Sequence, residues 1–515
     1  MKSKTKIFWI IILIAFVAAD IYMLFHNLGR GFLVQTDEAW HATNGYEMFK
    51  QGNWIINSYR YAADYFNSKP PLCLDLMMVS YKIFGVSNFA ARFPSALGGL
   101  ITIVLIIAFL IKDKKTYAAA LFPALFGACS TFFTFHMYRA AEMDAIYNLF
   151  FVIAMLSLYM MTEKPNFMCL YGLSFGLAFM CKGPHSALIF VIGLLYIPKC
   201  KEAFKSIPRV IISALLAAVI PLAWMAKRYM FDGMELINRL FMGEVAGRVS
   251  SANQTFSAPI IDFFTSNAFF GFVAIVIAAN VVSLLTKLGA KTADTSSSIS
   301  QNSASNSATE TTATSIKSFV WDNYLFIIWA IIPVVFFAIT RSFLSWYTYT
   351  AQIALCILTA RLAEYCIKDL GKEKTAPQLI TAALVIIVSL FYMVPTIMYD
   401  VNLAGTGGHP VDQFLEDMQS FKEQYGDTYL GVNAYLISDF RLDMENEDHW
   451  EPEYVAPAEM YPDLMPVDGS IDNFLSDPNS IIIVDKDRWD EFSGVLSGHV
   501  ILLDGSYLIM SSDMY

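Results

Sequence analysis

The sequence predicts a multi-spanning α-helical membrane protein that carries a small α/β domain at its C-terminal end. The first observation behind this prediction is composition. Hydrophobic residues make up 56% of the 515-residue chain and charged residues only 16%, and the mean hydropathy is +0.48. Soluble domains contain about 25% charged residues, so most of this protein must face lipid. The composition therefore excludes a nucleic-acid-binding protein, a cytosolic enzyme and a secreted disulfide scaffold.

The second observation is an uneven distribution of charge. From Asp400 to Tyr515 there are 24 acidic and 4 basic residues, whereas the rest of the chain has 21 acidic and 31 basic residues. This division predicts a membrane domain over residues 1–398 and an acidic soluble domain over 399–515, whose charges form a solvated, self-repelling surface. The seven cysteines end at Cys366 and lack CxxC spacing, which is typical of small core residues rather than of a metal cluster.

Eleven apolar segments approach the length of about 20 residues that crosses a bilayer. The first follows Lys2, Lys4 and Lys6 and is not followed by a small-residue cleavage site, which predicts an uncleaved membrane helix. The predicted spans cover residues 7–25, 91–111, 117–136, 143–161, 166–181, 184–198, 207–226, 264–286, 319–339, 343–365 and 378–398.

The connections between these spans predict an orientation in the plasma membrane. Lysine-rich connections occur on alternate loops, and the positive-inside rule places them in the cytoplasm together with the N-terminus. They are residues 112–115, 163–164, 199–205, 287–317 and 368–374. The extracytoplasmic side then receives the long segment 26–90, the loop 227–263 and the tail.

Two regions differ in character from the spans. Residues 292–316 are rich in Ser, Thr, Ala and Asn, which predicts a disordered cytoplasmic linker within 288–317. The tail shows a helical pattern at 411–425 and strand-like patterns, and it contains no catalytic motif. The predicted strands are residues 429–436, 480–484, 499–503 and 507–510.

An acidic pair, Asp37-Glu38, follows the first span. Two adjacent carboxylates cannot both face the same side of a helix, so one can enter a cavity while its neighbour makes a structural bond. A carboxylate in a cavity could orient or deprotonate an acceptor hydroxyl, an effect of roughly 10²–10⁴ in rate. The alternative is structural, with Thr36 or Asp37 capping a helix that runs to Phe49.

Lys69 is followed by two prolines, which restrict the backbone and place the lysine on a stiff extended segment. A rigidly held ammonium group suits a phosphate. The alternative is a turn that begins a helix over residues 72–84.

Further charged and aromatic residues lie at the predicted outer ends of spans. Snorkelling or interfacial anchoring could explain each of them alone. Placing a charged residue inside a bilayer, however, costs roughly 2.5–3.5 kcal/mol. The basic residues of this set all lie on the same predicted side, which indicates an anionic ligand there, most naturally a lipid phosphate. The residues are Arg92, Arg139, Glu142, Asp144, Lys182, Arg341 and the Trp346-Tyr347 pair.

These motifs resemble a known family. The acidic pair, Lys69-Pro70-Pro71, an Arg-Phe-Pro-Ser sequence from Arg92, Arg139-Ala140-Ala141 before Asp144, and Lys182-Gly183-Pro184 occur in an order similar to that of the protein O-mannosyltransferase and aminoarabinose transferase group. That group belongs to the GT-C superfamily of polytopic glycosyltransferases. The resemblance covers residues 30–200. The family often has a basic-proline-tyrosine run near the tenth span, whereas residues 341–347 here lack the proline.

The resemblance implies a GT-C-like fold and an inverting transfer of a sugar from a polyprenyl-phosphate donor to an extracytoplasmic lipid, glycan or protein. The resemblance implies that Asp37 is the catalytic carboxylate, that Lys69 binds the donor phosphate, and that Arg139 and Asp144 line the site with Lys182 and Arg341 as supporting charges. Together with the charges at the outer rim, it leads us to expect Glu38 to be catalytic beside Asp37 and Arg139 and Arg341 to bind the donor phosphate. The expected substrate site comprises Arg92, Asp144, Lys182 and Tyr347. Membrane lipids are the other expected partners. The outward loops 26–90 and 227–263 contain no Asp-x-Asp motif, so we expect no cofactor and no obligatory metal ion.

Two other functions remain open from the sequence. An oligosaccharide ligase or polymerase would need a larger outer cavity. A lipid-linked glycan transporter or flippase would place charges near the bilayer midplane and show inverted repeats, and the sequence displays neither pattern. A receptor or scaffold would leave the charges at the outer rim unexplained.

Overall fold

The computed structural model describes residues 3–33, 35–247, 254–294, 317–437, 451–467 and 471–514. The chain forms two compact units. The first comprises Met1–His26, Ala96–Tyr138 and Met143–Asp400, and the second comprises Asn27–Ser95, Arg139–Glu142 and Val401–Tyr515. The predicted outer segment 26–90 thus groups almost entirely with the acidic tail, whereas the sequence analysis had assigned it to the membrane domain.

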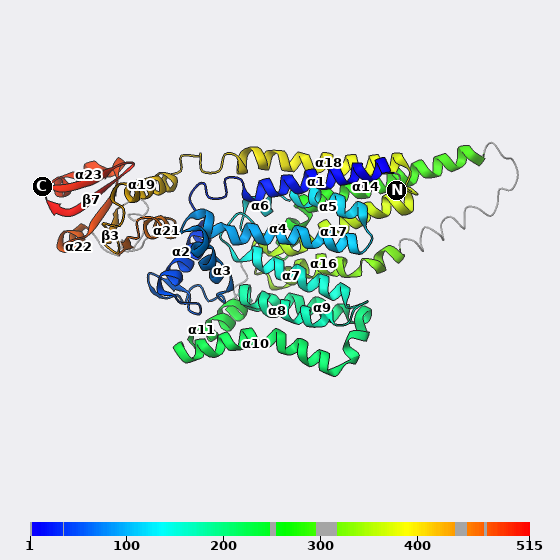
Figure 1. Ribbon diagram of the computed structural model, residues 1–515, viewed down its shortest axis with the longest axis horizontal. Helices are drawn as coiled ribbons and strands as arrows, with labels where there is room; N and C mark the ends of the chain where they lie inside the picture. The colour runs from blue at the N-terminus through cyan, green and yellow to red at the C-terminus, as the bar shows by residue number, and fades with distance from the viewer. Residues whose placement is uncertain are drawn as a thin grey trace. The chain divides into compact units, whose positions relative to one another are not determined.

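The first unit consists of helices (Figure 1). Its α-helices are α1 (Ser3–Phe25), α4 (Asn88–Lys112, whose first turns belong to the second unit), α5 (Thr116–Gly127), α6 (Thr131–Thr134), α7 (Met143–Met160), α8 (Phe167–Lys182), α9 (Ala187–Cys200), α10 (Ile207–Asp232), α11 (Glu235–Asn238), α13 (Ala258–Thr265), α14 (Asn267–Asp294), α16 (Tyr324–Thr340), α17 (Tyr349–Tyr365) and α18 (Thr375–Pro395). Short 3₁₀ and π segments join or extend them: η1 (Gly183–Ser186), η2 (Lys201–Lys205), η3 (Arg239–Gly247), η4 (Ser345–Thr348), η5 (Cys366–Leu370) and η6 (Thr396–Val401).

Eight helical stretches of the described chain are long and apolar enough to cross a membrane, and α5 and α16 are shorter apolar helices. One of the eight, Phe167–Lys205, contains two predicted spans. It folds back at Gly183, which has φ +54°. The Tyr171 hydroxyl of α8 donates a hydrogen bond to the Ile189 carbonyl of α9 (2.8 Å) across this turn. With that stretch divided, each of the eleven predicted spans corresponds to a helix, and the multi-spanning helical fold is confirmed.

One predicted span is shorter than expected. The helix predicted over 117–136 ends at Gly127, and only the short α6 follows. A Cβ atom at Gly127 would lie 2.4 Å from the Oδ1 of Asp20, so the chain passes α1 at a distance that only glycine permits. The predicted linker 288–317 also begins late, because α14 continues to Asp294. Its residues 295–316 lie outside the described part of the chain.

Helices α8 and α10 approach each other closely along a glycine-lined face. Gly172 and Gly176 are four residues apart and therefore lie on the same side of α8. A Cβ atom at Gly172 would come within 2.2 Å of the Ser213 carbonyl oxygen, and one at Gly176 within 2.7 Å of the Ala217 carbonyl oxygen. Small residues at this spacing let the backbones of membrane helices pack directly.

The second unit contains the remaining elements. Its N-terminal part has α2 (Gln35–Gln51), a two-stranded hairpin of β1 (Ser58–Tyr59) and β2 (Ala62–Ala63), and α3 (Leu72–Phe84). The tail adds α19 (Pro410–Tyr425), β3 (Asn433–Ile437), α21 (Pro452–Met460), β4 (Met465–Pro466), α22 (Ile471–Ser476), β5 (Ile481–Asp485), η7 (Lys486–Arg488), α23 (Trp489–Leu496), β6 (His499–Asp504) and β7 (Tyr507–Met514).

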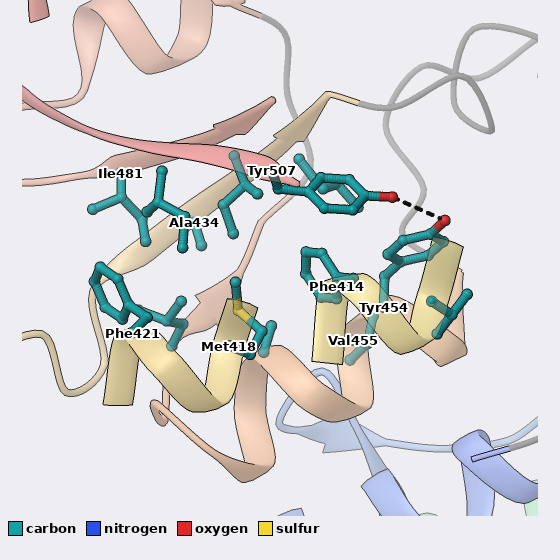
Figure 2. Close-up of a cluster of buried hydrophobic side chains, with 14 residues drawn as sticks. Phe414, Met418, Phe421, Ala434, Tyr454, Val455, Ile481 and Tyr507 are labelled. Atoms are coloured by element: carbon teal, nitrogen blue, oxygen red, sulfur yellow. Dashed lines mark hydrogen bonds between the residues drawn. The ribbon is translucent and has the colours of Figure 1, made fainter. Parts of the chain in front are cut away.

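The tail forms the predicted α/β domain. Its sheet has the order β4-β3-β5-β7-β6, with β3 parallel to β4 and β5 and with β7 antiparallel to β5 and β6. The central strand β5 is apolar at four consecutive positions because helices cover both faces of the sheet. On one face, Phe414, Met418 and Phe421 of α19 pack against Ala434, Ile481 and Tyr507 (Figure 2).

The opposite face of the sheet has a separate core. Tyr435, Ile482 and Met510 point to this side and pack against Phe474 of α22 and Leu496 of α23. Neighbouring residues such as Ile481 and Ile482 enter different cores because side chains alternate along a strand. Both faces of β5 are therefore buried, which explains why its sequence has no polar face.

Helix α2 packs against α21, so the tail is directly attached to the segment that carries the acidic pair. Near the start of α2, the Thr36 hydroxyl donates to Glu453 (3.2 Å). Near its end, Lys50 and Tyr46 both bind Asp463, with the Lys50 Nζ 2.6 Å from Oδ2. The segment between α1 and α2 also contacts the tail, because the Phe32 amide donates a hydrogen bond to Asp412 (2.8 Å).

Candidate active site

The predicted site residues are divided between the two units. Asp37, Glu38, Lys69, Arg92 and Arg139 belong to the second unit. The residues of the first unit are Asp144, Lys182, Arg341 and Tyr347.

Glu38 is buried and fully engaged. Its carboxylate pairs with Arg92 through Nε (2.8 Å) and Nη2 (3.0 Å), and it also accepts the backbone N–H of Ala141 (2.8 Å). A bidentate, hydrogen-bonded pair of this kind compensates for the loss of water around both charges. Glu38 therefore fixes α2 to α4 and to the segment 139–142, in which Arg139 is half-buried.

Arg92 has no donor left for a substrate. Besides its two bonds to Glu38, it donates from Nη1 to the carbonyls of Leu28 (3.2 Å) and Arg30 (3.0 Å) and from Nη2 to that of Phe32 (2.7 Å). A guanidinium group has five N–H donors, and all five are used here. The structure thus gives Arg92 a role in holding the chain after α1, in place of the substrate contact expected from its position at the outer rim.

Asp37 has the opposite environment from its neighbour. It lies exposed in the first turn of α2, and it has no hydrogen bond or ion pair with the residues that the structure describes. One of its carboxylate oxygens lies within 4.8 Å of a carboxylate oxygen of Glu142, and the Oε2 of Glu142 lies 3.1 Å from the Nδ1 of His41. His41 and Glu142 are therefore neighbours of the expected catalytic group. The spacing of Asp37 and His41, four residues apart on one helix, was the sequence signal for this arrangement.

Hydrogen bonding fixes the backbone at Lys69, while its side chain makes no ion pair within the described residues. Asn57 donates from Nδ2 to the carbonyls of Lys69 (2.9 Å) and Asn67 (2.8 Å), and Pro70 and Pro71 follow directly. Helix α3 begins at Leu72, so the predicted stiff segment and the predicted helix start are both present. Within the described residues the ammonium group has no ion-pair partner, and the side chain is half-buried. It remains available to an anionic ligand.

Three of the expected residues in the first unit lie together. Asp144, at the start of α7, and Lys182, at the end of α8, form a buried ion pair (Oδ1 to Nζ, 2.5 Å). The Lys182 Nζ also lies 5.0 Å from the ring centroid of Tyr347 and 5.8 Å from that of Tyr147. Aromatic faces attract an ammonium group, so the two rings and the Asp144 carboxylate together hold the Lys182 side chain in place.

The environment of Arg341 differs from that of the buried Asp144–Lys182 pair. It follows α16 directly, has a left-handed backbone (φ +53°), and is exposed. Its carbonyl accepts the N–H of Gln254 (3.1 Å), and no ion pair involves it within the described ranges. The nearby Trp346 stacks on His136 with ring centroids 3.8 Å apart. Arg341 is therefore a second cation available to a ligand.

The fold is similar to that of a solved protein. ArnT from Cupriavidus metallidurans, in a crystal structure bound to undecaprenyl phosphate, matches 98% of this chain and 98% of its own with a TM-score of 0.68 at 15% identity. The apo structure of the same protein matches with a TM-score of 0.66. This chain has the GT-C fold. The likeness confirms both the multi-spanning architecture and the C-terminal domain expected from the sequence.

Sequence comparisons agree with this GT-C assignment. Residues 68–225 match the family model for dolichyl-phosphate-mannose-protein mannosyltransferase. An undecaprenyl phosphate-α-4-amino-4-deoxy-L-arabinose arabinosyl transferase from Serratia proteamaculans is 24% identical over 376 residues, which are 71% of this chain and 61% of that relative. The Yersinia pestis protein of the same name is 28% identical over 200 residues, 36% of this chain and 35% of its own. The resemblance to the mannosyltransferase and aminoarabinose transferase group is confirmed.

Proposed function

We propose that this protein is an integral-membrane inverting glycosyltransferase that transfers a sugar from a polyprenyl-phosphate donor to an extracytoplasmic acceptor. The observation that carries the proposal is the contrast between neighbouring charges in the second unit. Glu38 and Arg92 neutralise each other, whereas neither the Asp37 carboxylate nor the Lys69 ammonium group has an ion-pair partner within the described chain. A free carboxylate and a free ammonium on rigid supports are the two groups that this reaction requires.

The proposed reaction breaks the bond between the anomeric carbon of the sugar and the phosphate oxygen of the donor. The acceptor attacks the opposite face of that carbon, which inverts its configuration, and polyprenyl phosphate leaves. Lys69 stabilises the negative charge that grows on the phosphate. Asp37 orients the acceptor and takes its proton where the acceptor is a hydroxyl group.

The first unit contributes a second set of groups. We assign Arg341 to the donor phosphate, because it is an exposed cation, and Tyr347 with the Asp144–Lys182 pair to the substrate site. Arg139 lies three residues before Glu142 in the segment tied to Glu38, and we assign it to the phosphate as well.

The names of the relatives suggest which donors to test. The arabinosyl transferases act, by their names, on undecaprenyl phosphate-α-4-amino-4-deoxy-L-arabinose, and the family model names dolichyl-phosphate-mannose. The full-length protein would be reconstituted in liposomes with undecaprenyl-phosphate-linked aminoarabinose or mannose. A bacterial membrane extract would supply the acceptor, and mass spectrometry would follow both free undecaprenyl phosphate and the glycosylated product.

We expect Asp37→Asn to reduce transfer by about 10²- to 10⁴-fold through loss of the carboxylate. We expect Lys69→Ala to weaken donor use, because the phosphate loses its cation. Matched controls are Asp472→Asn, a first-turn carboxylate of α22, and Lys82→Ala, an exposed lysine of α3. Unchanged transfer in both site variants would contradict the assignment, and donor turnover without a glycosylated product would point to hydrolysis or flipping.

A further inference from the structure

Glu47 of α2 and Glu459 of α21 meet in the interior of the second unit. Their relative exposures are 0% and 1%, and the two carboxyl groups are hydrogen-bonded to each other. A hydrogen bond between two carboxyl groups needs a proton on one of them, and two ionised carboxylates at this depth would repel each other without water to separate them.

The neighbouring donors determine which group is ionised. Glu47 accepts hydrogen bonds from the Ser58 hydroxyl (2.7 Å) and from the N–H groups of Arg60 (2.6 Å) and Tyr61 (2.6 Å). Three donors favour the carboxylate form of Glu47. The Oε2 of Glu459 has no hydrogen-bond partner within the described residues, so an ionised Glu459 would be poorly solvated. Glu459 therefore carries the proton and donates it to Glu47.

The electrostatic surroundings agree with this assignment. Burial raises the pKa of Glu47 to about 7, although its three hydrogen bonds oppose the shift. Burial and then the charge of Glu47 raise the pKa of Glu459 well above its usual range. The titratable groups that face the pair come from α2, the β1–β2 hairpin, the loop after the hairpin and the segment that follows α21. Arg60 is the one cation among these groups, which are Tyr46, Tyr59, Arg60, Tyr61, Asp64 and Asp463.

The pair lies between the other contacts that join α2 to the tail. Thr36 binds Glu453 near the beginning of α2, and Lys50 binds Asp463 near its end. Asp37 occupies the first turn of this same helix. A change in how α2 packs against α21 would therefore be transmitted to the expected catalytic carboxylate through a rigid helix.

We propose that Glu47 and Glu459 are positioning residues, whose shared proton holds α2 against α21 and thereby fixes the orientation of Asp37. The acidic tail then acts as the support for the catalytic helix. This inference rests on the proposed function for the role of Asp37, but the shared proton itself does not depend on it. Loss of the proton places two like charges in contact and loosens this interface.

The direction of the pH effect follows from the raised pKa values. An unfolded glutamate loses its proton near pH 4.5, whereas the folded pair keeps its protons to a higher pH. The contribution of the pair to stability is therefore complete below about pH 4.5 and decreases as the pH rises through about 7 and beyond. The α2–α21 interface should be tight in mildly acidic solution and looser in alkaline solution.

Hydrogen–deuterium exchange of the full-length protein in detergent tests the shared proton without any substrate. Protection factors, corrected for the intrinsic effect of pH, would be measured for α2 and α21 between pH 6 and pH 9. We expect the wild type to lose at least tenfold protection over this range. Glu459→Gln cannot ionise and retains an N–H donor for Glu47, so its protection should be independent of pH. Glu423→Gln, an exposed position of α19, should behave like the wild type.

The same pH series with undecaprenyl-phosphate aminoarabinose tests the link to transfer. The wild type should lose kcat at alkaline pH with little change in donor KM, and Glu459→Gln should retain it. An identical pH response of protection in the wild type and Glu459→Gln, or no response in the wild type, would overturn the shared-proton proposal. Absence of turnover in every variant, with the exchange difference intact, would instead refute the assigned reaction and leave the pair established.

Discussion

The neighbouring carboxylates Asp37 and Glu38 of α2 have different environments. Successive residues of a helix point in directions about 100° apart, so Glu38 turns towards Arg92 while Asp37 remains exposed. The sequence argument allowed one of the two adjacent carboxylates to make a structural bond, and Glu38 makes it although it was also expected to be catalytic. The resemblance favoured Asp37 as the catalytic carboxylate, and that assignment stays a prediction. The contacts explain the choice in physical terms, because an acid already bound by a guanidinium group and a backbone amide is a poor proton acceptor.

The buried pair formed by Glu38 and Arg92 predicts a large effect on stability. Replacing Arg92 with Leu leaves Glu38 buried and uncompensated, which should cost about 3–5 kcal/mol and lower the unfolding temperature in detergent. The double variant Glu38→Gln/Arg92→Leu should lose less than the sum of the two single variants. Arg239→Leu, which removes the exposed Arg239–Glu235 pair, should change stability by less than about 1 kcal/mol. Equal losses for the two arginine variants would contradict the assigned role of Arg92.

At the level of elements, direct backbone packing decides how the membrane helices fit together. Water does not drive helices together in a bilayer, so close van der Waals contact between small residues must do so. Gly172 and Gly176 create such a surface on α8, and the Ser213 hydroxyl of α10 adds a hydrogen bond to the Met168 carbonyl (2.7 Å). The short α5 follows the same logic, because Gly127 admits the buried Asp20 beside it.

Substitution of Gly172 tests this packing. The Cβ atom of Ala would meet the backbone oxygen of Ser213 at 2.2 Å, so α8 and α10 must separate. We expect a loss of about 1–3 kcal/mol, typical of overpacking, despite the better helix propensity of Ala. Gly494→Ala in α23 is the control, because its Cβ would enter open space. Thermal unfolding in detergent measures both variants, and equal stability would show that the two helices are not in direct contact.

At the scale of the whole molecule, charge is unevenly distributed between a basic helical part and an acidic tail. The tail folds as a sheet with helices on both faces, which requires polar outer surfaces on those helices. Residues 27–95 join this unit through the packing of α2 on α21 and through the hydrogen bond from the Phe32 amide to Asp412 of α19. The expected catalytic residue Asp37 and the acidic tail therefore belong to one folded body, which the linear order of the sequence did not reveal.

The expected orientation in the membrane can be tested by labelling. The lysine-rich loops predict a cytoplasmic location for Glu163 and an extracytoplasmic location for Ser497 in the tail. In a background with the partly exposed Cys169 replaced by Ala, Ser497→Cys should react with an impermeant maleimide in intact cells. Glu163→Cys should react only after permeabilisation. Labelling in the reverse order would contradict the orientation, and the parent Cys169→Ala protein reports any background from the buried cysteines.

The sequence alone determined the features that depend on local pattern. Apolar runs matched to bilayer thickness located the membrane helices, the strand-like patterns of the tail located strands, and the two prolines after Lys69 marked a stiff segment before a helix. Only the tertiary structure decided which charges neutralise each other and which remain free. Arg92 pairs with Glu38, which is 54 residues away in the sequence, and Glu459 contacts Glu47 from the C-terminal tail. A buried ionisable group needs a partner because it has lost its water, and the fold determines which group is close enough to be that partner.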